Sequence, residues 1–197
     1  MVTELKIVSG DPALDLVNTV GDDRVPDPLD RYESFAEWAA RVGVIDDTTG
    51  RRLAARGRGR PVRADRALTE ARDLRAVMDA VFRPLAKGAG GPPQAALRRL
   101  VALAGAAVER GRLEAADGGF RLVWGGDHLE RPLWPLAAAA VDLLRSGPLD
   151  RLKACADCPW LFLDTSRNRS RRWCTMDDCG SRSKMRRYRA RRATAGR

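Results

Sequence analysis

The chain has few of the features that catalysis, secretion or membrane insertion require. Its 197 residues include a single histidine, His128, no Gly-rich phosphate loop and no nucleophile with an evident base, so we expect no enzyme. The N-terminus shows no basic region followed by an apolar stretch and a cleavage site, which predicts a cytoplasmic protein. The longest alanine and leucine run, residues 133–144, is too short to span a membrane and contains Pro135 and Asp142.

Positive charge is concentrated at one end of the chain. The formal net charge is +10, and residues 151–197 hold 14 Lys and Arg against four Asp. Residues 1–150 hold 22 charges of each sign and therefore balance at zero. A basic tail beside a neutral body is typical of a module that binds a polyanion, and it also fits a solvated tail.

Apolar spacing predicts a mainly α-helical N-terminal domain with one small β-hairpin, an α+β arrangement over residues 1–148. Apolar residues recur at intervals of three and four in several segments, which predict helices over residues 29–42, 64–85, 94–110 and 131–145. Alternation around Asp117-Gly118-Gly119 predicts the hairpin within residues 113–124. Residues 21–28 are rich in Asp and Pro, and residues 56–60 alternate Arg and Gly, so both segments are predicted to be loops. Residues 147–150 are the predicted linker to a second domain, residues 149–197.

All four cysteines lie in this second domain, with the spacing of a zinc site. Cys155 and Cys158 form a C-x2-C pair, fifteen residues follow, and Cys174 and Cys179 form a C-x4-C pair. Each pair supplies two thiolates from a tight turn, and the spacer lets the turns meet around a tetrahedron. Two disulfides are the alternative, which a cytoplasmic location disfavours. We therefore predict one zinc ion per chain, in a structural role because four cysteines leave no open position.

The residues around the cysteines predict a treble-clef-like zinc finger. Residues 160–163 have the aromatic and apolar content of a short strand, and residues 164–170 form a polar turn. The segment after Cys179 has helix-forming composition, with Ser181 or Ser183 available as its N-cap.

From Cys155, the sequence CADCPWLFLDTSRNRSRRWCTMDDCGSRSKMRRYRARR resembles the CGNR zinc finger, a bacterial module named for Cys-Gly-Asn-Arg at its last ligand. The segment ALDLVNT, residues 13–19, is similar to the start of the N-terminal domain of that family, known as ABATE. Proteins of this type are regarded as candidate stress-induced transcription regulators, so the resemblance implies nucleic-acid binding through the finger. This chain has Ser181 where the family has Asn. A helix-capping role would survive that exchange, whereas a base contact by the Asn amide would not.

Two basic surfaces flank the predicted metal site, and we expect them to bind DNA through phosphate contacts. The candidate residues are Arg167, Asn168, Arg169, Arg171 and Arg172 on the turn and Arg182, Lys184, Arg186, Arg187 and Arg189 on the helix. RNA or a ribosomal surface, and an acidic protein partner, remain alternatives. The neutral N-terminal domain could sense a ligand or form a homodimer. Asn18, Thr19 and Arg75 are candidate ligand residues, although Asn18 and Thr19 also suit a cap or turn.

Overall fold

The computed structural model describes residues 7–20 and 27–195, so most of the loop predicted over residues 21–28 lies outside the described residues. The body contains helices α1 (Pro12–Val17), α2 (Tyr32–Val42), α3 (Asp47–Arg58), α4 (Pro61–Lys87), α5 (Gln94–Glu109) and α6 (Leu133–Ser146), the short turn η1 (Pro28–Asp30), and strands β1 (Arg112–Ala116) and β2 (Gly119–Val123). The C-terminal part contains the turn η2 (Leu149–Arg151), strands β3 (Leu152–Ala154) and β4 (Leu161–Leu163), the π-helical turn η3 (Met176–Gly180) and helix α7 (Ser181–Ala195). Within the described part of the chain, no helix is long and apolar enough to cross a membrane.

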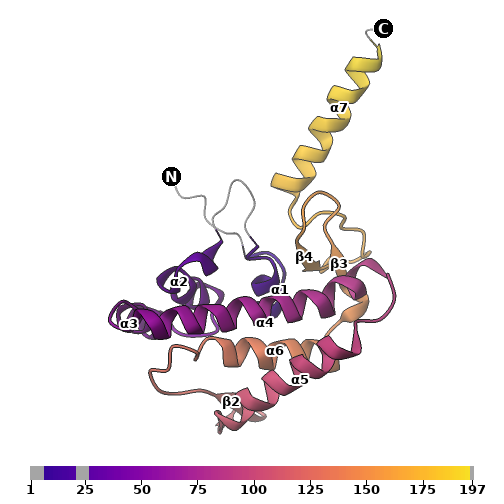
Figure 1. Cartoon of the computed structure of the whole chain (residues 1–197). Helices are drawn as coiled ribbons and strands as arrows, with labels where there is room; N and C mark the ends of the chain where they lie inside the picture. Colours follow the sequence, from indigo (N-terminus) through magenta and orange to yellow (C-terminus); the bar gives the residue numbers. More distant parts are fainter. Residues whose placement is uncertain (1–6, 21–26, 196–197) are drawn as a thin grey trace.

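The long helix α4 is the centre of the body, with α2 and α3 at one end and α5 and α6 below it in Figure 1. Its buried stripe includes Leu74, Met78 and Phe82, which recur at four-residue intervals. Phe35 of α2 is also fully buried in this core. Each large apolar side chain removed from water in this way contributes roughly 1.5–3 kcal/mol. The mainly α fold with one small hairpin that the sequence predicts is therefore confirmed.

Helix α3 corrects one prediction, because the sequence predicts a loop over residues 56–60 and α3 continues to Arg58. Its glycines allow close packing against α2. A Cβ atom on Gly57 would lie 2.5 Å from Tyr32 Cδ1, and one on Gly50 would lie 2.8 Å from Ala40 Cβ. Gly57, one of the two glycines that suggested a loop, is thus a residue that lets the two helices approach each other.

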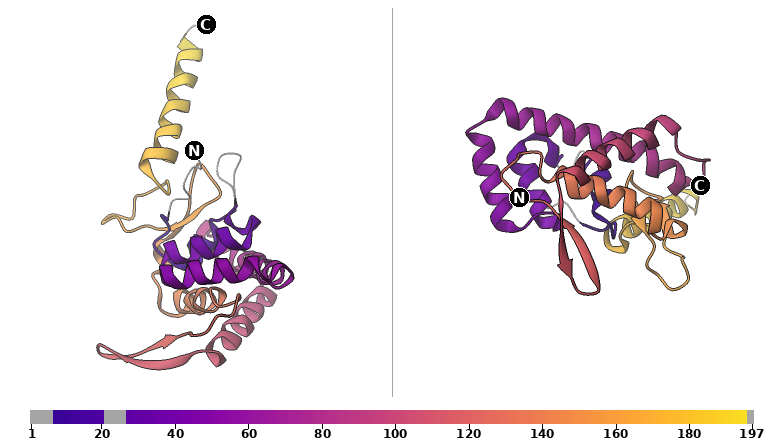
Figure 2. Two further views of the ribbon diagram at one scale, coloured as in Figure 1. Left: turned by 90° about the vertical axis from the view of Figure 1, so that its left-hand side faces the viewer. Right: turned by 90° about the horizontal axis from the view of Figure 1, so that it is seen from below.

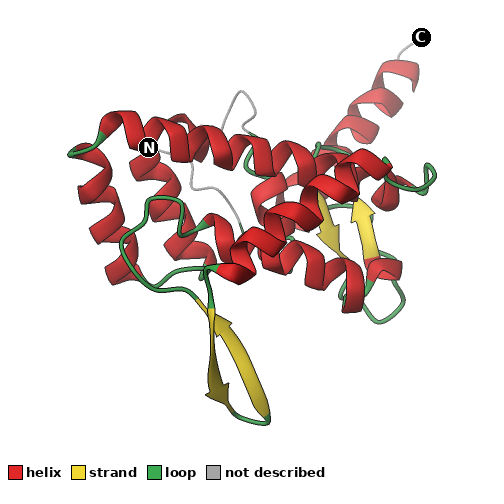
Figure 3. Ribbon diagram, turned by 60° about the horizontal axis from the view of Figure 1, so that its bottom comes forward, coloured by secondary structure: helices red, strands yellow, loops and turns green. Residues whose placement is uncertain are grey.

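The β1–β2 hairpin forms where the alternating pattern places it. Its strands are antiparallel, and the register pairs Leu113 with Leu122 and Ala115 with Phe120. The hairpin projects from the helical body into solvent (Figure 3), and 73% of Phe120 and 67% of Leu113 are exposed.

Strands β3 and β4 of the C-terminal part pack directly on the helical body. Leu152, Leu161 and Leu163 belong to the same hydrophobic core as α1, α4 and α6. Backbone pairing joins β3 to β4 in an antiparallel register, with Leu152 opposite Leu163. The side chain of Arg83 on α4 donates to the carbonyl oxygen of Pro159 at 2.8 Å. Beyond these contacts, α7 projects away from the body as a separate rod (Figures 1 and 2).

Candidate metal centre and basic surfaces

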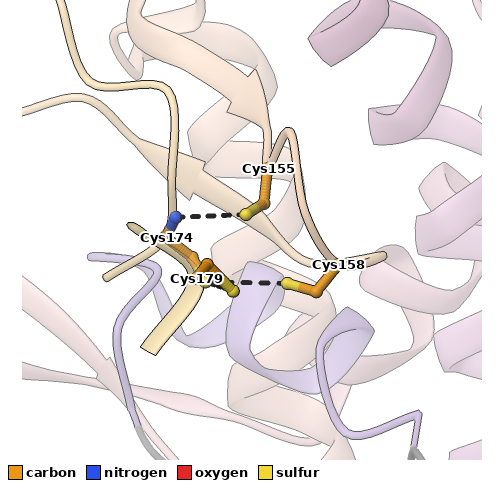
Figure 4. Close-up of side chains that lie close together, drawn as sticks. All are labelled: Cys155, Cys158, Cys174 and Cys179. Carbon is orange, nitrogen blue, oxygen red and sulfur yellow. Dashed lines mark hydrogen bonds between the residues drawn. The ribbon is translucent and has the colours of Figure 1, made fainter. Parts of the chain in front are cut away.

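Four cysteine thiols converge between the β3–β4 hairpin and the start of α7 (Figure 4). All four Sγ atoms lie within 4.8 Å of one another. The Sγ atom of Cys174 is 3.6 Å from that of Cys158 and also 3.6 Å from that of Cys179. Zn–S bonds of about 2.3 Å in a tetrahedron imply S···S separations of about 3.8 Å, so the observed spacing fits zinc.

Charge also favours a cation at this position. Hydrogen bonds within the cluster lower the pKa of Cys155 and raise the pKa of Cys158 to about 12. Hydrogen bonds from Cys155 and Cys158 and burial likewise raise the pKa of Cys174. Four thiolates this close together repel one another, and a divalent ion would offset their charge while leaving no open coordination position. The donor set suits a structural zinc ion.

The backbone of the finger brings the two cysteine pairs together. The amide of Cys155 donates to the carbonyl of Trp160 at 2.8 Å, which closes the first turn. The amide of Ala156 donates to the carbonyl of Arg172 at 2.9 Å, and the amide of Cys174 donates to Cys155 Sγ at 3.4 Å. These bonds connect the first turn to the segment that leads to the second pair.

The turn that carries Cys179 continues without a break into α7, and this corrects the predicted N-cap. Thr175 caps the π-helical turn η3, since its side chain accepts a hydrogen bond from the amide of Asp178 at 3.4 Å. Ser181 instead donates its hydroxyl to the carbonyl of Met176 at 3.1 Å. Because the π-helical turn η3 runs directly into α7 at Ser181, the cap of the combined helical segment is Thr175 and not Ser181 or Ser183.

Asp157, between the two cysteines of the first pair, connects the metal site to α7. Its side chain is only 1% exposed and accepts hydrogen bonds from Arg182 Nε at 2.8 Å and from Arg186. Arg182 also donates to Cys179 Sγ at 2.9 Å. Burial raises the pKa of Asp157, but the hydrogen bonds from Arg186 and Arg182 outweigh it and hold that pKa below its usual range. The bond to Asp157 correspondingly raises the pKa of Arg182.

A second buried carboxylate organises the polar turn of residues 164–170. Asp164 is 0% exposed and accepts hydrogen bonds from Lys153 Nζ at 2.7 Å, from the Ser166 hydroxyl at 2.6 Å and from the Arg171 amide at 2.9 Å. Burial raises the pKa of Asp164, yet these bonds, led by that of Lys153, lower it well below its usual range. The turn is therefore fixed from inside by an ion pair.

The predicted nucleic-acid residues of the turn divide into exposed and internally bound groups. Arg167 and Asn168 are exposed. Arg169 adopts a left-handed backbone conformation with φ of 51° and pairs with Asp150 at 2.5 Å. The guanidinium of Arg171 lies 4.7 Å from the Phe162 ring centroid, and that of Arg172 lies 5.6 Å from the ring of Trp173. Arg171 additionally donates to the carbonyl of Cys174 at 2.5 Å, so its role in the structure is internal.

The helix divides in the same way. Arg182 and Arg186 both bind Asp157, although the side chain of Arg186 is 63% exposed. Lys184, Arg187 and Arg189 are also exposed. Contact of any of these residues with nucleic acid stays a prediction.

The predicted ligand residues all take part in internal hydrogen bonds. The side chain of Asn18 donates to the carbonyl of Leu161 at 2.8 Å and accepts from its amide at 2.7 Å, which joins the body to β4. Arg75 donates to the Thr19 hydroxyl at 3.0 Å and to Asp27 at 2.6 Å. The structure thus brings Thr19 and Arg75 together and directs Asn18 towards the finger, while a ligand role for the three stays a prediction.

A separate cavity of about 580 Å³ lies between α4, α5 and α6. Charged side chains of both signs line it, together with His128, and Leu74 and Trp134 form apolar walls. The ring centroids of His128 and Trp134 are 5.6 Å apart, so the single histidine packs beside an aromatic ring.

Sequence reasoning missed four residues that hold the site together: Lys153, Asp157 and Asp164 within the finger, and Arg83 on α4. None of them is part of a sequence pattern with a fixed spacing, such as the one that identifies the cysteines. The one available signal is that Asp157 and Asp164 are two of only four acidic residues in the basic C-terminal part.

Four thiols that converge between the β3–β4 hairpin and the start of a basic helix define a zinc-finger protein with a helical N-terminal body. The chain belongs to the ABATE family, whose model matches residues 10–147 and is described as "Putative stress-induced transcription regulator". The CGNR zinc finger matches residues 151–192. No curated protein is significantly similar to the chain. The family and the finger predicted from the sequence are confirmed, and the four cysteines are positioned to bind one metal ion, consistent with one structural zinc.

Proposed function

We propose that this chain regulates transcription by binding DNA through its zinc finger. The family description supports a regulatory role. The observation that carries the DNA proposal is α7, which projects from the body with its first two turns held at the metal centre (Figure 1). Its exposed residues Lys184, Arg187 and Arg189 can meet several phosphates along one strand.

The polar turn supplies a second point of contact. Arg167 and Asn168 are exposed at its tip, and the turn is fixed internally by Lys153 and Asp164. A fixed turn can present an amide to a base edge in a groove, so we propose Asn168 as the residue that discriminates between sequences. Phosphate contacts by α7 would then position the finger without reading sequence.

Salt dependence of binding tests the proposal directly. We expect fluorescence anisotropy with a labelled 30-base-pair DNA duplex to give a logarithmic salt slope near −4.5, the value for about five phosphate contacts. Replacing Lys184, Arg187 and Arg189 together by Gln should reduce the slope by up to about 0.9 for each phosphate that the variant no longer neutralises. The matched control replaces Arg58, Arg63 and Arg98, three exposed arginines of the body, and should leave the slope unchanged.

The same measurement separates the alternatives. Tighter binding of an RNA duplex or single strand of equal length would favour RNA as the partner. A slope near zero with both nucleic acids would exclude the proposal and would favour an acidic protein partner.

We propose further that the helical body senses a small ligand in the cavity between α4, α5 and α6. The supporting observation is that α4 lines this cavity through Asp73 and Leu74 and also reaches the turn that carries the first cysteine pair (the knuckle, residues 155–159), where Arg83 donates to the carbonyl of Pro159. A panel of amino acids and dicarboxylates should include one that raises the thermal midpoint of the wild type but not that of Ala107→Trp, which fills the cavity. No shift with any compound at millimolar concentration would exclude these ligand classes. The predicted homodimer is checked by sedimentation of the same protein.

A further inference from the structure

Arg182 has two hydrogen-bond partners in the finger. Its Nε donates to Asp157 at 2.8 Å, and its terminal nitrogen donates to the Cys179 thiol at 2.9 Å. Arg186, one helical turn later, donates to the other carboxylate oxygen of Asp157. The nearly inaccessible Asp157 carboxylate therefore holds two successive turns of α7, and one of them also contacts a metal ligand.

We propose that Asp157, Arg182 and Arg186 form a clamp that sets the direction of α7, and that the helix contacts nucleic acid with its opposite face, through Lys184 and Arg187. This inference deepens the proposed function and rests on it for the nucleic-acid contact. Arg182 and Arg186 are then positioning residues, although a count of basic residues would place them among the contacts.

Helical geometry separates the two faces. With 3.6 residues per turn, the mean direction of Lys184 and Arg187 lies roughly 150° around the axis from that of Arg182 and Arg186. Lys184 and Arg187 are exposed. Arg182 is half-buried, and its Nε and one terminal nitrogen are already hydrogen-bonded within the finger. The side chain of Arg186 is 63% exposed, but its guanidinium donates to Asp157.

The clamp has a physical reason to exist. Helix α7 has no acidic residue and no continuous apolar stripe, since Met185 and Tyr188 are more than half exposed. Packing therefore cannot orient it against the body. A buried carboxylate that accepts from two arginines can do so, because charge-assisted hydrogen bonds are directional and roughly twice as strong as neutral ones.

Amide hydrogen exchange tests the positioning part in the full-length, zinc-loaded protein. We expect Asp157→Asn and Arg186→Gln to accelerate exchange in the first two turns of α7 about tenfold, as removal of a charge-assisted hydrogen bond implies. Asp157→Glu should restore much of the protection. Lys184→Gln removes the same charge as Arg186→Gln and should leave exchange unchanged. Zinc content is measured for each variant, and Arg186→Gln decides the test if Asp157→Asn loses the metal.

DNA binding tests the division between the faces. Lys184→Gln and Arg187→Gln should each lower the salt slope by about 0.9, while Arg186→Gln should leave the slope unchanged even where affinity falls. Equal reductions of the slope for Arg186→Gln and Lys184→Gln, with unaltered exchange in α7, would overturn the proposal. If the wild type shows no salt-dependent binding to DNA, the proposed function fails, whereas the exchange comparison still decides whether the clamp exists.

Discussion

The contact between the Arg182 guanidinium and Cys179 Sγ should affect how fast the metal is released. A donor to a ligating sulfur stabilises the thiolate, and removal of such an outer partner typically weakens metal affinity about 10–100-fold. We therefore expect the Arg182→Gln variant to release zinc to a colorimetric chelator at a rate at least about tenfold higher than that of the wild type. Lys184→Gln has the same change in charge without a sulfur contact and should behave like the wild type. Equal rates for both variants would show that the contact has no influence on the metal.

Asp164 should make the stability of the protein depend on pH. Its pKa in the folded protein is below the ordinary value of 3.8, so its stabilising contribution is complete above about pH 4 and is lost as the pH falls through the lowered pKa. Asp164→Asn should lower the thermal midpoint of the zinc-loaded protein at pH 7, because Lys153 then faces an uncharged partner. The difference between wild type and variant should shrink below pH 4. A difference that stays constant from pH 7 to pH 3 would contradict the role assigned to this carboxylate.

At the scale of single elements, the glycines of the helices have opposite consequences. A Cβ at Gly57 of α3 would collide with the Tyr32 ring, so Gly57→Ala should destabilise the protein by about 1–3 kcal/mol. Gly105 in α5 has no neighbour within 4 Å of a Cβ, so Gly105→Ala should stabilise it by roughly 0.5–1 kcal/mol. Urea unfolding followed by circular dichroism measures both. A stabilising Gly57→Ala would show that α2 and α3 do not pack as closely as described.

The same elements show what could be predicted from sequence. The stripe of α4 and the alternation of the β1–β2 hairpin are local patterns, so the predictions over residues 64–85 and 113–124 are correct. The end of helix α3 is not predicted because Gly57 lowers the local helix propensity. The reason for a glycine there is its close contact with Tyr32, which is distant along the chain. The cysteine spacing locates the metal site. The bonds of Asp157 could not be predicted, since they depend on the angle between the knuckle and α7.

The whole molecule shares one core across its two parts, which predicts coupled unfolding. Leu161 of the finger is fully buried against the body, so Leu161→Ala should lower the free energy of unfolding by about 2–5 kcal/mol. We expect the helical signal of the body to report this destabilisation. Leu113→Ala in the exposed hairpin is the control and should change stability by no more than about 0.5 kcal/mol. Chelation of zinc should shift the same transition.

Two separate transitions, with the body unaffected by Leu161→Ala, would instead indicate independent units. Asn18 would be the next residue to replace, because its paired hydrogen bonds with Leu161 are buried between the two parts.

The projecting rod α7 has a consequence for the thermodynamics of binding. It has 15 residues, a length at which an isolated helix is marginal in water. Beyond Arg186 its arginines repel one another, as do Arg189 and Arg192 on neighbouring turns, and the helix itself contains no carboxylate to offset them. A polyanion removes this repulsion, so association should make the ellipticity at 222 nm more negative, and the ordering of these turns should contribute a favourable enthalpy and an unfavourable entropy to binding. If the proposed function holds, the partner would complete the outer turns of α7, whereas Asp157 fixes the inner turns within the protein.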